Sequence, residues 1–220
     1  MNDTKRLIAL LFGWVILLGM GGCAIKEVTP PTTRYVLNES TPGLVTLMLA
    51  QPRFDRLEIT TLAPNRESGS LQIFYRLPDH TMTAYAYHRW TETPARMLAR
   101  KITLALLNTH TVSTPILPGS GATAPWRLEW QPLVWYQDFT ATPSKVRTII
   151  QATLLDNEHG KVVASRLFRV DLPAPSDDAP GGVEAFNRAA DRLVADLVTW
   201  LQHVPLPSER QRALPRTDQR

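Results

Sequence analysis

The sequence predicts an α+β domain with a mainly antiparallel sheet and two helices packed on one face of it. Three observations carry this prediction. Segments of alternating apolar and polar residues come first, followed by one helical segment, three more alternating segments and a second helical segment. The last two alternating segments flank residues 156–160, which end in Gly160 and are typical of a β-hairpin turn. The final segment has the strongest helical apolar stripe in the chain.

The first third of the chain predicts short strands separated by turns. Residues 35–37 are a brief apolar segment, residues 44–50 fit a strand or a turn, and residues 56–62, 71–76 and 81–87 alternate as strands do. Proline, asparagine, glycine and serine residues separate these segments and predict turns. We therefore expect several short strands before the first helix.

Two segments have the spacing of amphipathic helices. Thr93 is a candidate N-cap and is followed by a proline, and the apolar stripe that comes next leaves Lys101 largely outside it. The second helix is expected over residues 183–201, where Asp177 or Asp178 can cap or complement its N-terminus. Both helices can bury one apolar face against a sheet.

The clearest strand pattern covers residues 126–139, 146–155 and 161–172. Prolines and glycines between residues 115 and 121 predict a loop before these strands. Pro132 argues against an unbroken central strand, because proline donates no ladder hydrogen bond, and predicts an edge position or a bulge.

Composition and charge exclude several classes of protein. The 220 residues are 44% hydrophobic and 20% charged, which excludes disorder throughout the chain. A single cysteine excludes an intramolecular disulfide framework and zinc sites built from several cysteines. The net charge of +4 includes +1 from residues 1–22 and +2 from residues 203–220, which leaves about +1 for the folded part. This charge does not indicate a nucleic-acid partner.

The N-terminus has the features of a lipoprotein signal peptide. Two basic residues precede an apolar run over residues 7–20, which is shorter than the roughly 20 apolar residues of a spanning helix. Two glycines follow, and then Cys23. The segment resembles a bacterial lipobox in which Met20 stands where leucine is usual. The alternative is an uncleaved anchor with an incidental cysteine.

The lipobox resemblance implies removal of residues 1–22 and attachment of N-acyl and S-diacylglycerol groups to Cys23. Two or more acyl chains anchor a protein stably where one does not. Ala24 stands where sorted lipoproteins retained in the inner membrane have aspartate, so the resemblance implies the periplasmic face of the outer membrane. Residues 23–33 are expected to be a tether, residues 34–204 the domain and residues 205–220 a disordered tail.

Four segments in order carry a family resemblance. They are residues 35–37 (Tyr-Val-Leu), residues 85–94 (Tyr-Ala-Tyr-His-Arg-Trp-Thr-Glu-Thr-Pro), residues 165–168 (Ser-Arg-Leu-Phe) and the alanine-rich residues 185–201. In this order the chain resembles the ABC-type transport auxiliary lipoproteins, which are similar to the outer-membrane lipoprotein of the paraquat-inducible Pqi system.

The family resemblance implies a non-catalytic role. Such lipoproteins belong to systems with MCE-domain and ABC or integral-membrane components that move lipid between the two membranes. The expected partners are a periplasmic MCE-domain protein, docked at the outer membrane, and further copies of the chain in a homo-oligomer. Two alternatives stay open: a carrier holding a lipid in an aromatic groove, and a plug or chaperone of an outer-membrane β-barrel.

Three residues are candidate contacts for a partner or a second copy: Arg89, Trp90 and Tyr35. Tryptophan and arginine are frequent in the centres of interfaces, but Trp90 can equally pack the start of the first helix onto the sheet. The same two interpretations apply to the tryptophans within residues 126–135, which fit either a lipid groove or the core.

The sequence offers no catalytic or metal-binding pattern. It has no G-x-S-x-G turn, and its five histidines are scattered without H-x-x-x-H or H-E-x-x-H spacing. We therefore expect no enzyme activity, no metal and no cofactor other than the lipid on Cys23.

Overall fold

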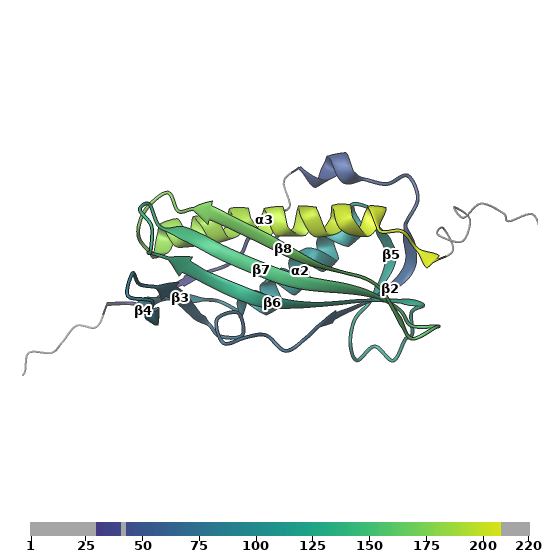
Figure 1. The fold of residues 1–220 in the computed structure, drawn as a ribbon, viewed down its shortest axis with the longest axis horizontal. Helices are drawn as coiled ribbons and strands as arrows, with labels where there is room; N and C mark the ends of the chain where they lie inside the picture. The colour runs from purple at the N-terminus through teal and green to yellow at the C-terminus, as the bar shows by residue number, and fades with distance from the viewer. Residues whose placement is uncertain (1–29, 41–42, 208–220) are drawn as a thin grey trace, which may run out of the picture. The chain divides into compact units, whose positions relative to one another are not determined.

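The structure is a computed structural model that describes residues 30–40 and 43–207. The expected signal peptide, Cys23 and nearly all of the expected tail lie outside the described residues. Contacts divide the chain into two units, Met1–Pro31 and Thr32–Arg220, and the second unit holds the fold (Figure 1).

The second unit is an α+β fold, as predicted. Its strands are β1 (Thr33–Tyr35), β2 (Phe54–Thr61), β3 (Gln72–Arg76), β4 (Met82–Trp90), β5 (Val112–Ile116), β6 (Trp126–Asp138), β7 (Lys145–Asp156) and β8 (Lys161–Pro173). Its helices are the 3₁₀ turn η1 (Leu44–Leu47) and the α-helices α2 (Pro94–Asn108) and α3 (Ala179–His203).

Strand β6 organises the sheet. One of its edges runs antiparallel to β7, which is paired in turn with β8. The other edge is shared, because the start of β6 pairs parallel with β2 and its end pairs parallel with β3. The pairings β1–β4 and β2–β5 are also parallel, whereas β3–β4 is antiparallel.

The sheet is therefore mixed, and the predicted mainly antiparallel arrangement is wrong. Antiparallel neighbours can follow each other through tight turns, whereas parallel neighbours need long connections. Alternation along the chain identifies a strand but does not reveal a neighbour that lies far away in sequence. The hairpin β7–β8 was accessible to this reasoning, while the pairs β2–β6 and β3–β6 were not.

The bulge predicted at Pro132 is confirmed. The register between β6 and β7 shifts between Pro132 and Val134. This irregularity lies between the part of β6 that pairs with β2 and the part that pairs with β3. There the side-chain amide of Asn65 donates a 3.0 Å hydrogen bond to the Leu133 carbonyl. A loop side chain thus replaces a strand partner where proline interrupts the ladder.

Several element boundaries differ from the sequence expectations. The first strand lies at Thr33–Tyr35 rather than at residues 35–37, and residues 44–47 form a 3₁₀ turn. Strand β5 was missed, because Pro115 made its segment look like a loop. It pairs with β2 alone among the described strands, and an edge position tolerates proline.

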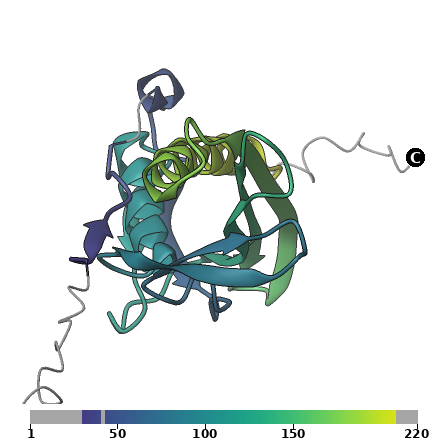
Figure 2. The same cartoon turned by 90° about the vertical axis from the view of Figure 1, so that its left-hand side faces the viewer.

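The helix caps agree with the sequence. The Thr93 side chain accepts a hydrogen bond from the backbone N–H of Arg96, and Asp178 accepts one from Gly181. Helix α2 packs against β2 and β5, α3 packs against β7 and β8, and the two helices contact each other. Figure 2 shows the two helices lying along the side that the curved sheet leaves open, so that helices and sheet together enclose the interior. In the described part of the chain, no helix has the length and apolar character needed to cross a membrane.

Candidate functional site

The candidate contact residues come together where β1 joins the sheet. The parallel register places Arg34 beside Arg89 and Tyr35 beside Trp90. The Tyr35 carbonyl accepts a 2.7 Å hydrogen bond from the Thr91 backbone. Cys23, the expected lipid attachment site, lies outside the described residues.

Trp90 is a core residue. Its side chain is only 1% exposed and meets the Phe186 ring edge-to-face, with ring centroids 5.7 Å apart. It therefore offers no surface to a partner, and the expectation of a contact at Trp90 is corrected in favour of core packing. The physical reason is its place at the end of β4, where its side chain faces α3.

The tryptophans of β6 also fill the core. Trp130 and Trp135 are 0% and 2% exposed, and Trp135 stacks on Phe186 with centroids 5.2 Å apart. Trp126 is half-buried and contacts Phe54 edge-to-face. The core interpretation therefore holds for Trp130 and Trp135, and these two rings do not line a lipid groove.

Tyr35 lies in a group of aromatic side chains that we call the aromatic cluster. Its members are Tyr35, Tyr75, Tyr85, His88 and Phe139. The Tyr35 hydroxyl lies 3.1 Å from Nδ1 of His88, and the His88 ring meets Tyr85 edge-to-face at 5.8 Å. Tyr75 contacts Tyr85 and Phe139 at 4.6 and 5.6 Å between centroids. All members except Phe139 lie on β1, β3 or β4.

A bulge in β4 builds this cluster. Phe74 pairs with Ala84, but Gln72, two residues earlier, pairs with Arg89, five residues later. Three extra residues of β4 are therefore accommodated opposite β3. Strict alternation would place Tyr85 and Tyr87 on one face. The sequence does not reveal that Tyr75 and His88 contact Tyr85, because no local pattern shows this bulge.

The aromatic cluster rests on the start of α3 through Gln137. Tyr85 donates a 3.0 Å hydrogen bond to Oε1 of Gln137, whose amide donates to Ser144 at 2.8 Å. Gly182 permits this approach, because a Cβ at that position would lie 2.1 Å from the same Oε1 atom. Glycine is therefore needed at position 182 to leave room for the Gln137 side chain, and not because of its backbone angles.

The hydroxyls of Tyr35 and Tyr85 remain protonated at neutral pH. Burial raises the pKa of Tyr35 and of Tyr85, and the nearby carboxylate of Asp178 raises both further. Hydrogen bonds from Ser176 and the Gly181 N–H hold the pKa of Asp178 below its usual value. The cluster therefore presents aromatic rings and, at Tyr35 and Tyr85, protonated hydroxyls that can form hydrogen bonds. Such a surface suits contact with another molecule.

Arg89 is half-buried and Tyr87 is exposed, both on β4 beside the aromatic cluster. Tyr35, Tyr87 and Arg89 each keep a partly exposed side chain and so remain available for contacts, whereas Trp90 does not. The register places Tyr35 on the same face of the sheet as Trp90, and Arg89 on the opposite face. Among residues 30–40 and 43–207, no three His, Cys, Asp or Glu side chains gather in a way that could hold a metal ion.

A buried lysine fixes the segment that follows β1. Lys101 of α2 is 1% exposed, and its ammonium group donates 2.9 Å hydrogen bonds to the backbone and side-chain oxygens of Asn38. It also bonds the Ser40 carbonyl and lies 2.6 Å from Oδ1 of Asp191 on α3. The sequence places Lys101 largely outside the apolar stripe. The structure buries it because the segment after β1 and helix α3 both supply oxygen partners.

Comparisons with known proteins give the family. Residues 69–198 match the family model of the ABC-type transport auxiliary lipoprotein component. Protein XCC0632 from Xanthomonas campestris is 21% identical, with a TM-score of 0.65 over 76% of this chain and 94% of that one. An uncharacterized protein of solved structure is 11% identical, with a TM-score of 0.58 over 77% of this chain and 98% of that one. No curated protein matches the sequence.

The two solved structures show that the fold is shared, and the family match covers more than half of the 220 residues. The matched region runs from the turn before β3 almost to the end of α3. It includes Lys101 and every member of the aromatic cluster except Tyr35, which lies on β1. The chain belongs to the ABC-type transport auxiliary lipoprotein family.

Proposed function

We propose that this protein is a lipid-anchored, non-catalytic subunit of an MCE-type trans-envelope lipid transport system. In this proposal it sits on the periplasmic face of the outer membrane and docks the periplasmic MCE assembly there. The observation that carries the proposal is the family match over residues 69–198. The position of Cys23 directly after an apolar run and two glycines supports the anchor.

The proposed anchor would hold the aromatic cluster near the membrane. Thr33, the first residue of β1, lies ten positions after Cys23. An extended chain spans at most about 3.6 Å per residue, so β1 would begin within roughly 36 Å of the lipid. We assign Tyr35, Tyr87 and Arg89 as contact residues for the MCE partner or for further copies of the chain, with Tyr35 on one face of the β1–β4 pair and Arg89 on the other.

The proposal is tested by affinity purification of the tagged full chain in mild detergent, with the MCE-domain protein encoded beside it expressed in the same cells. We expect the MCE protein to be recovered with the wild-type chain. We expect the double variant Tyr35→Ala, Arg89→Ala to recover several-fold less. Recovery of no MCE protein by a folded, lipidated wild-type chain would sink the docking role.

Native mass spectrometry separates docking from lipid carriage. A carrier would retain a non-covalent lipid after purification of a chain that begins after Cys23. Under the docking proposal this species carries no such lipid. A stoichiometric bound lipid would favour the carrier.

A further inference from the structure

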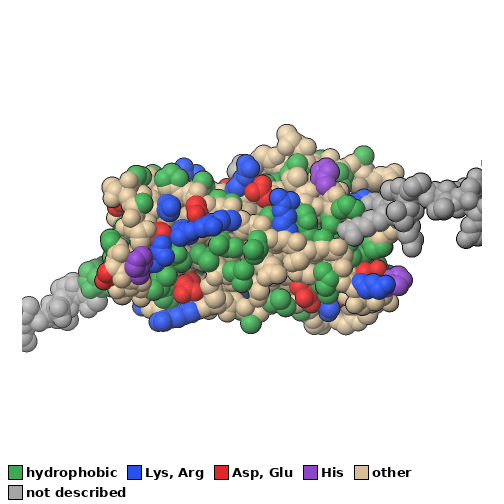
Figure 3. All heavy atoms as spheres, viewed as in Figure 1, with side chains coloured by type: hydrophobic (Ala, Val, Ile, Leu, Met, Phe, Trp, Pro, Cys, Tyr) green, Lys and Arg blue, Asp and Glu red, His purple; other side chains and the backbone are tan. Residues whose placement is uncertain are grey.

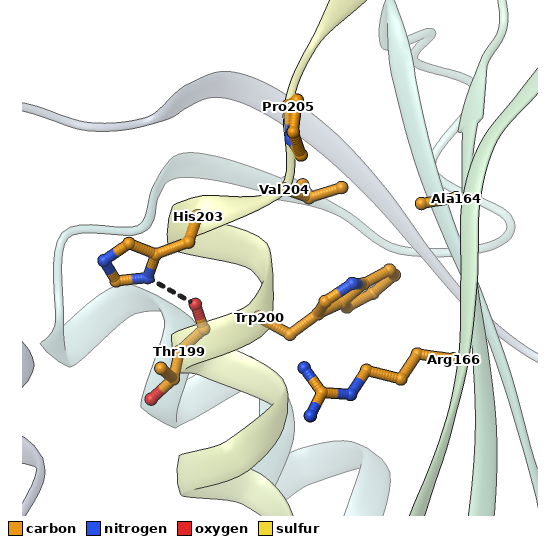
Figure 4. A pocket seen from close by; sticks show the side chains of 7 residues that line it. All are labelled: Ala164, Arg166, Thr199, Trp200, His203, Val204 and Pro205. Atoms are coloured by element: carbon orange, nitrogen blue, oxygen red, sulfur yellow. Dashed lines mark hydrogen bonds between the residues drawn. The ribbon is translucent and has the colours of Figure 1, made fainter.

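A groove lies between strand β8 and the C-terminal end of α3. It has a volume of about 330 Å³ and is lined on one side by Ala164 and Arg166 and on the other by Trp200, His203 and Val204. Figure 4 shows the Arg166 guanidinium and the Trp200 indole facing each other across this groove. Phe168, the next inward-facing residue of β8, contacts Trp200 edge-to-face at 5.7 Å. The groove therefore has one large aromatic side chain, Trp200, supported from below by Phe168, and a basic residue, Arg166, on its other side.

The strand beside this groove has a free edge. From Ser165 to Leu172, β8 pairs with β7 on one side and with no other described strand. The two most exposed large apolar side chains of the described residues, Val162 at 63% and Leu167 at 61%, both lie on this strand. An edge with unpaired backbone groups beside a groove can take up an extended segment as an additional strand.

The charge of the edge selects its partner. Strand β8 carries three cationic side chains, Lys161, Arg166 and Arg169, and one carboxylate. Arg166 lies over the Phe168 ring at 5.3 Å and forms no ion pair with any described carboxylate. His203 uses Nδ1 to reach the Thr199 carbonyl at 2.7 Å, which leaves its other ring nitrogen facing outward.

Cationic and apolar side chains also lie close together on the surface over β7 and β8 (Figure 3). A second copy paired along the same edge would bring two cationic strands together, which is unfavourable. An acidic strand would instead be attracted to Arg166, and a guanidinium–carboxylate contact is a strong, charge-assisted hydrogen bond. Charge therefore favours an acidic segment over self-pairing.

We propose that the groove binds an extended, acidic segment of a partner protein, which adds as a strand to the free edge of β8 and places a carboxylate against Arg166. The apolar side chains at the alternate positions of the segment would lie on the opposite face of the sheet, beside the exposed side chain of Leu167. The inference deepens the proposed docking role and rests on it for the source of the segment. The preference of the groove for an acidic strand rests on the geometry of β8 and α3.

The test measures fluorescence anisotropy of a fluorescein-labelled decapeptide of alternating valine and glutamate, titrated with the detergent-solubilised full chain. We expect saturable binding, and no binding of the matched valine–lysine peptide. Arg166→Gln should weaken binding about tenfold. The matched control is Arg169→Gln, since Arg169 lies on the opposite face of β8 beside Asp171, and its effect should stay within twofold.

A third probe distinguishes strand addition from adhesion of charge. The valine–glutamate peptide methylated at every backbone nitrogen keeps its charge but cannot donate hydrogen bonds to β8, so its binding should be lost. Equal binding of the methylated peptide would overturn strand addition. Failure of the unmethylated acidic peptide to bind at millimolar concentration would overturn the proposal as a whole.

Two further outcomes would assign the groove to another occupant and so overturn the proposal. A dimer that grows stronger in the Arg166→Gln variant, without peptide binding, would identify a second copy. Binding of phosphatidylglycerol micelles that Arg166→Gln abolishes, again without peptide binding, would identify an anionic lipid. If the peptide binds as expected but the MCE protein is not recovered, the docking role fails while the preference of the groove for an acidic strand stands.

Discussion

At the scale of single residues, the structure separates side chains that hold the fold from side chains that are free to make contacts. Trp90 and Arg89 are neighbours in sequence, yet Trp90 faces the core beside Phe186 and Arg89 is half-buried at the surface. Alternation of side chains along a strand explains this division. A mutation on this strand should therefore affect stability if its side chain faces the core, as at Trp90, and contacts if it faces the surface, as at Arg89.

Replacing Trp90 by alanine tests its core role. The large-to-small change should lower the free energy of unfolding by about 3–5 kcal/mol, because it removes a buried ring and leaves a cavity. Thermal unfolding followed by circular dichroism measures this. The control is Tyr87→Ala on the same strand, where an exposed ring should cost less than about 1 kcal/mol. An unchanged melting temperature for Trp90→Ala would contradict the core assignment.

Asp138 couples the sheet to pH. It lies beside Arg76 in the parallel β3–β6 register, with a 2.7 Å bond from the Arg76 guanidinium. Burial alone would raise the pKa of Asp138, but the hydrogen bonds from Arg76 and Thr140 together outweigh burial and hold the pKa below its usual value. The folded state therefore binds this proton less readily than the unfolded state does.

The stabilisation from Asp138 should be fully present above the unfolded pKa of about 3.9 and should be lost as pH falls through the lower, folded pKa. Asp138→Asn removes this pH-dependent stabilisation. We expect the variant to be less stable than the wild type at pH 7 and to lose less stability between about pH 4 and pH 2. Urea unfolding across this range measures the difference. Two curves that stay parallel down to pH 2 would rule out this role for Asp138.

At the scale of elements, Lys101 joins α2, α3 and the segment after β1. Its ammonium reaches Asp191 on one helix and Asn38 and Ser40 beyond the first strand. Breaking a buried ion pair costs more than its formation contributes, because the remaining charge has lost its partner.

Lys101→Met should therefore lower the free energy of unfolding by roughly 3 kcal/mol and increase hydrogen exchange at residues 38–40. The double variant Lys101→Met, Asp191→Leu should recover part of this loss, because it leaves no unpaired carboxylate. A single variant as stable as the wild type, with unchanged exchange at residues 38–40, would argue against this linkage.

Local chemistry made some elements predictable and left others hidden. The sequence predicts Thr93, and either Asp177 or Asp178, as caps because a cap depends on a few adjacent residues, and it predicts an edge position or a bulge at Pro132 for the same reason. The structure has caps at Thr93 and Asp178 and a bulge after Pro132. The parallel pairs of β6 and the burial of Lys101 depend on partners far away in sequence, and no local pattern encodes them. For the same reason, the sequence indicates Tyr35 as a candidate contact residue but does not reveal the other members of the aromatic cluster as its neighbours.

At the scale of the whole molecule, the folded domain carries two distinct surfaces, and the proposed lipid anchor precedes it in the chain. The first is the aromatic cluster with Arg89, on the strand that continues from the expected tether. The second is the basic groove between β8 and α3. Cys23 connects both surfaces to a membrane only if it is acylated.

Cys23→Ala tests the anchor directly. The wild-type chain should incorporate labelled palmitate and fractionate with membranes, since two or more acyl chains give stable attachment. The variant chain should incorporate no labelled palmitate and should not be converted to the processed, acylated form. Cleavage and membrane attachment that persist in the variant would point to an uncleaved N-terminal anchor instead.

The central claim is that this lipoprotein docks an MCE assembly at the outer membrane. The most direct measurement is the amount of MCE-domain protein that, after chemical cross-linking of intact cells, separates with outer membranes on a density gradient. We expect a substantial fraction of the MCE-domain protein to separate with outer membranes in cells with the wild-type chain. Most of this fraction should be lost in cells with the Cys23→Ala variant and in cells without the chain. An outer-membrane fraction of MCE protein that is the same in all three strains would contradict the claim.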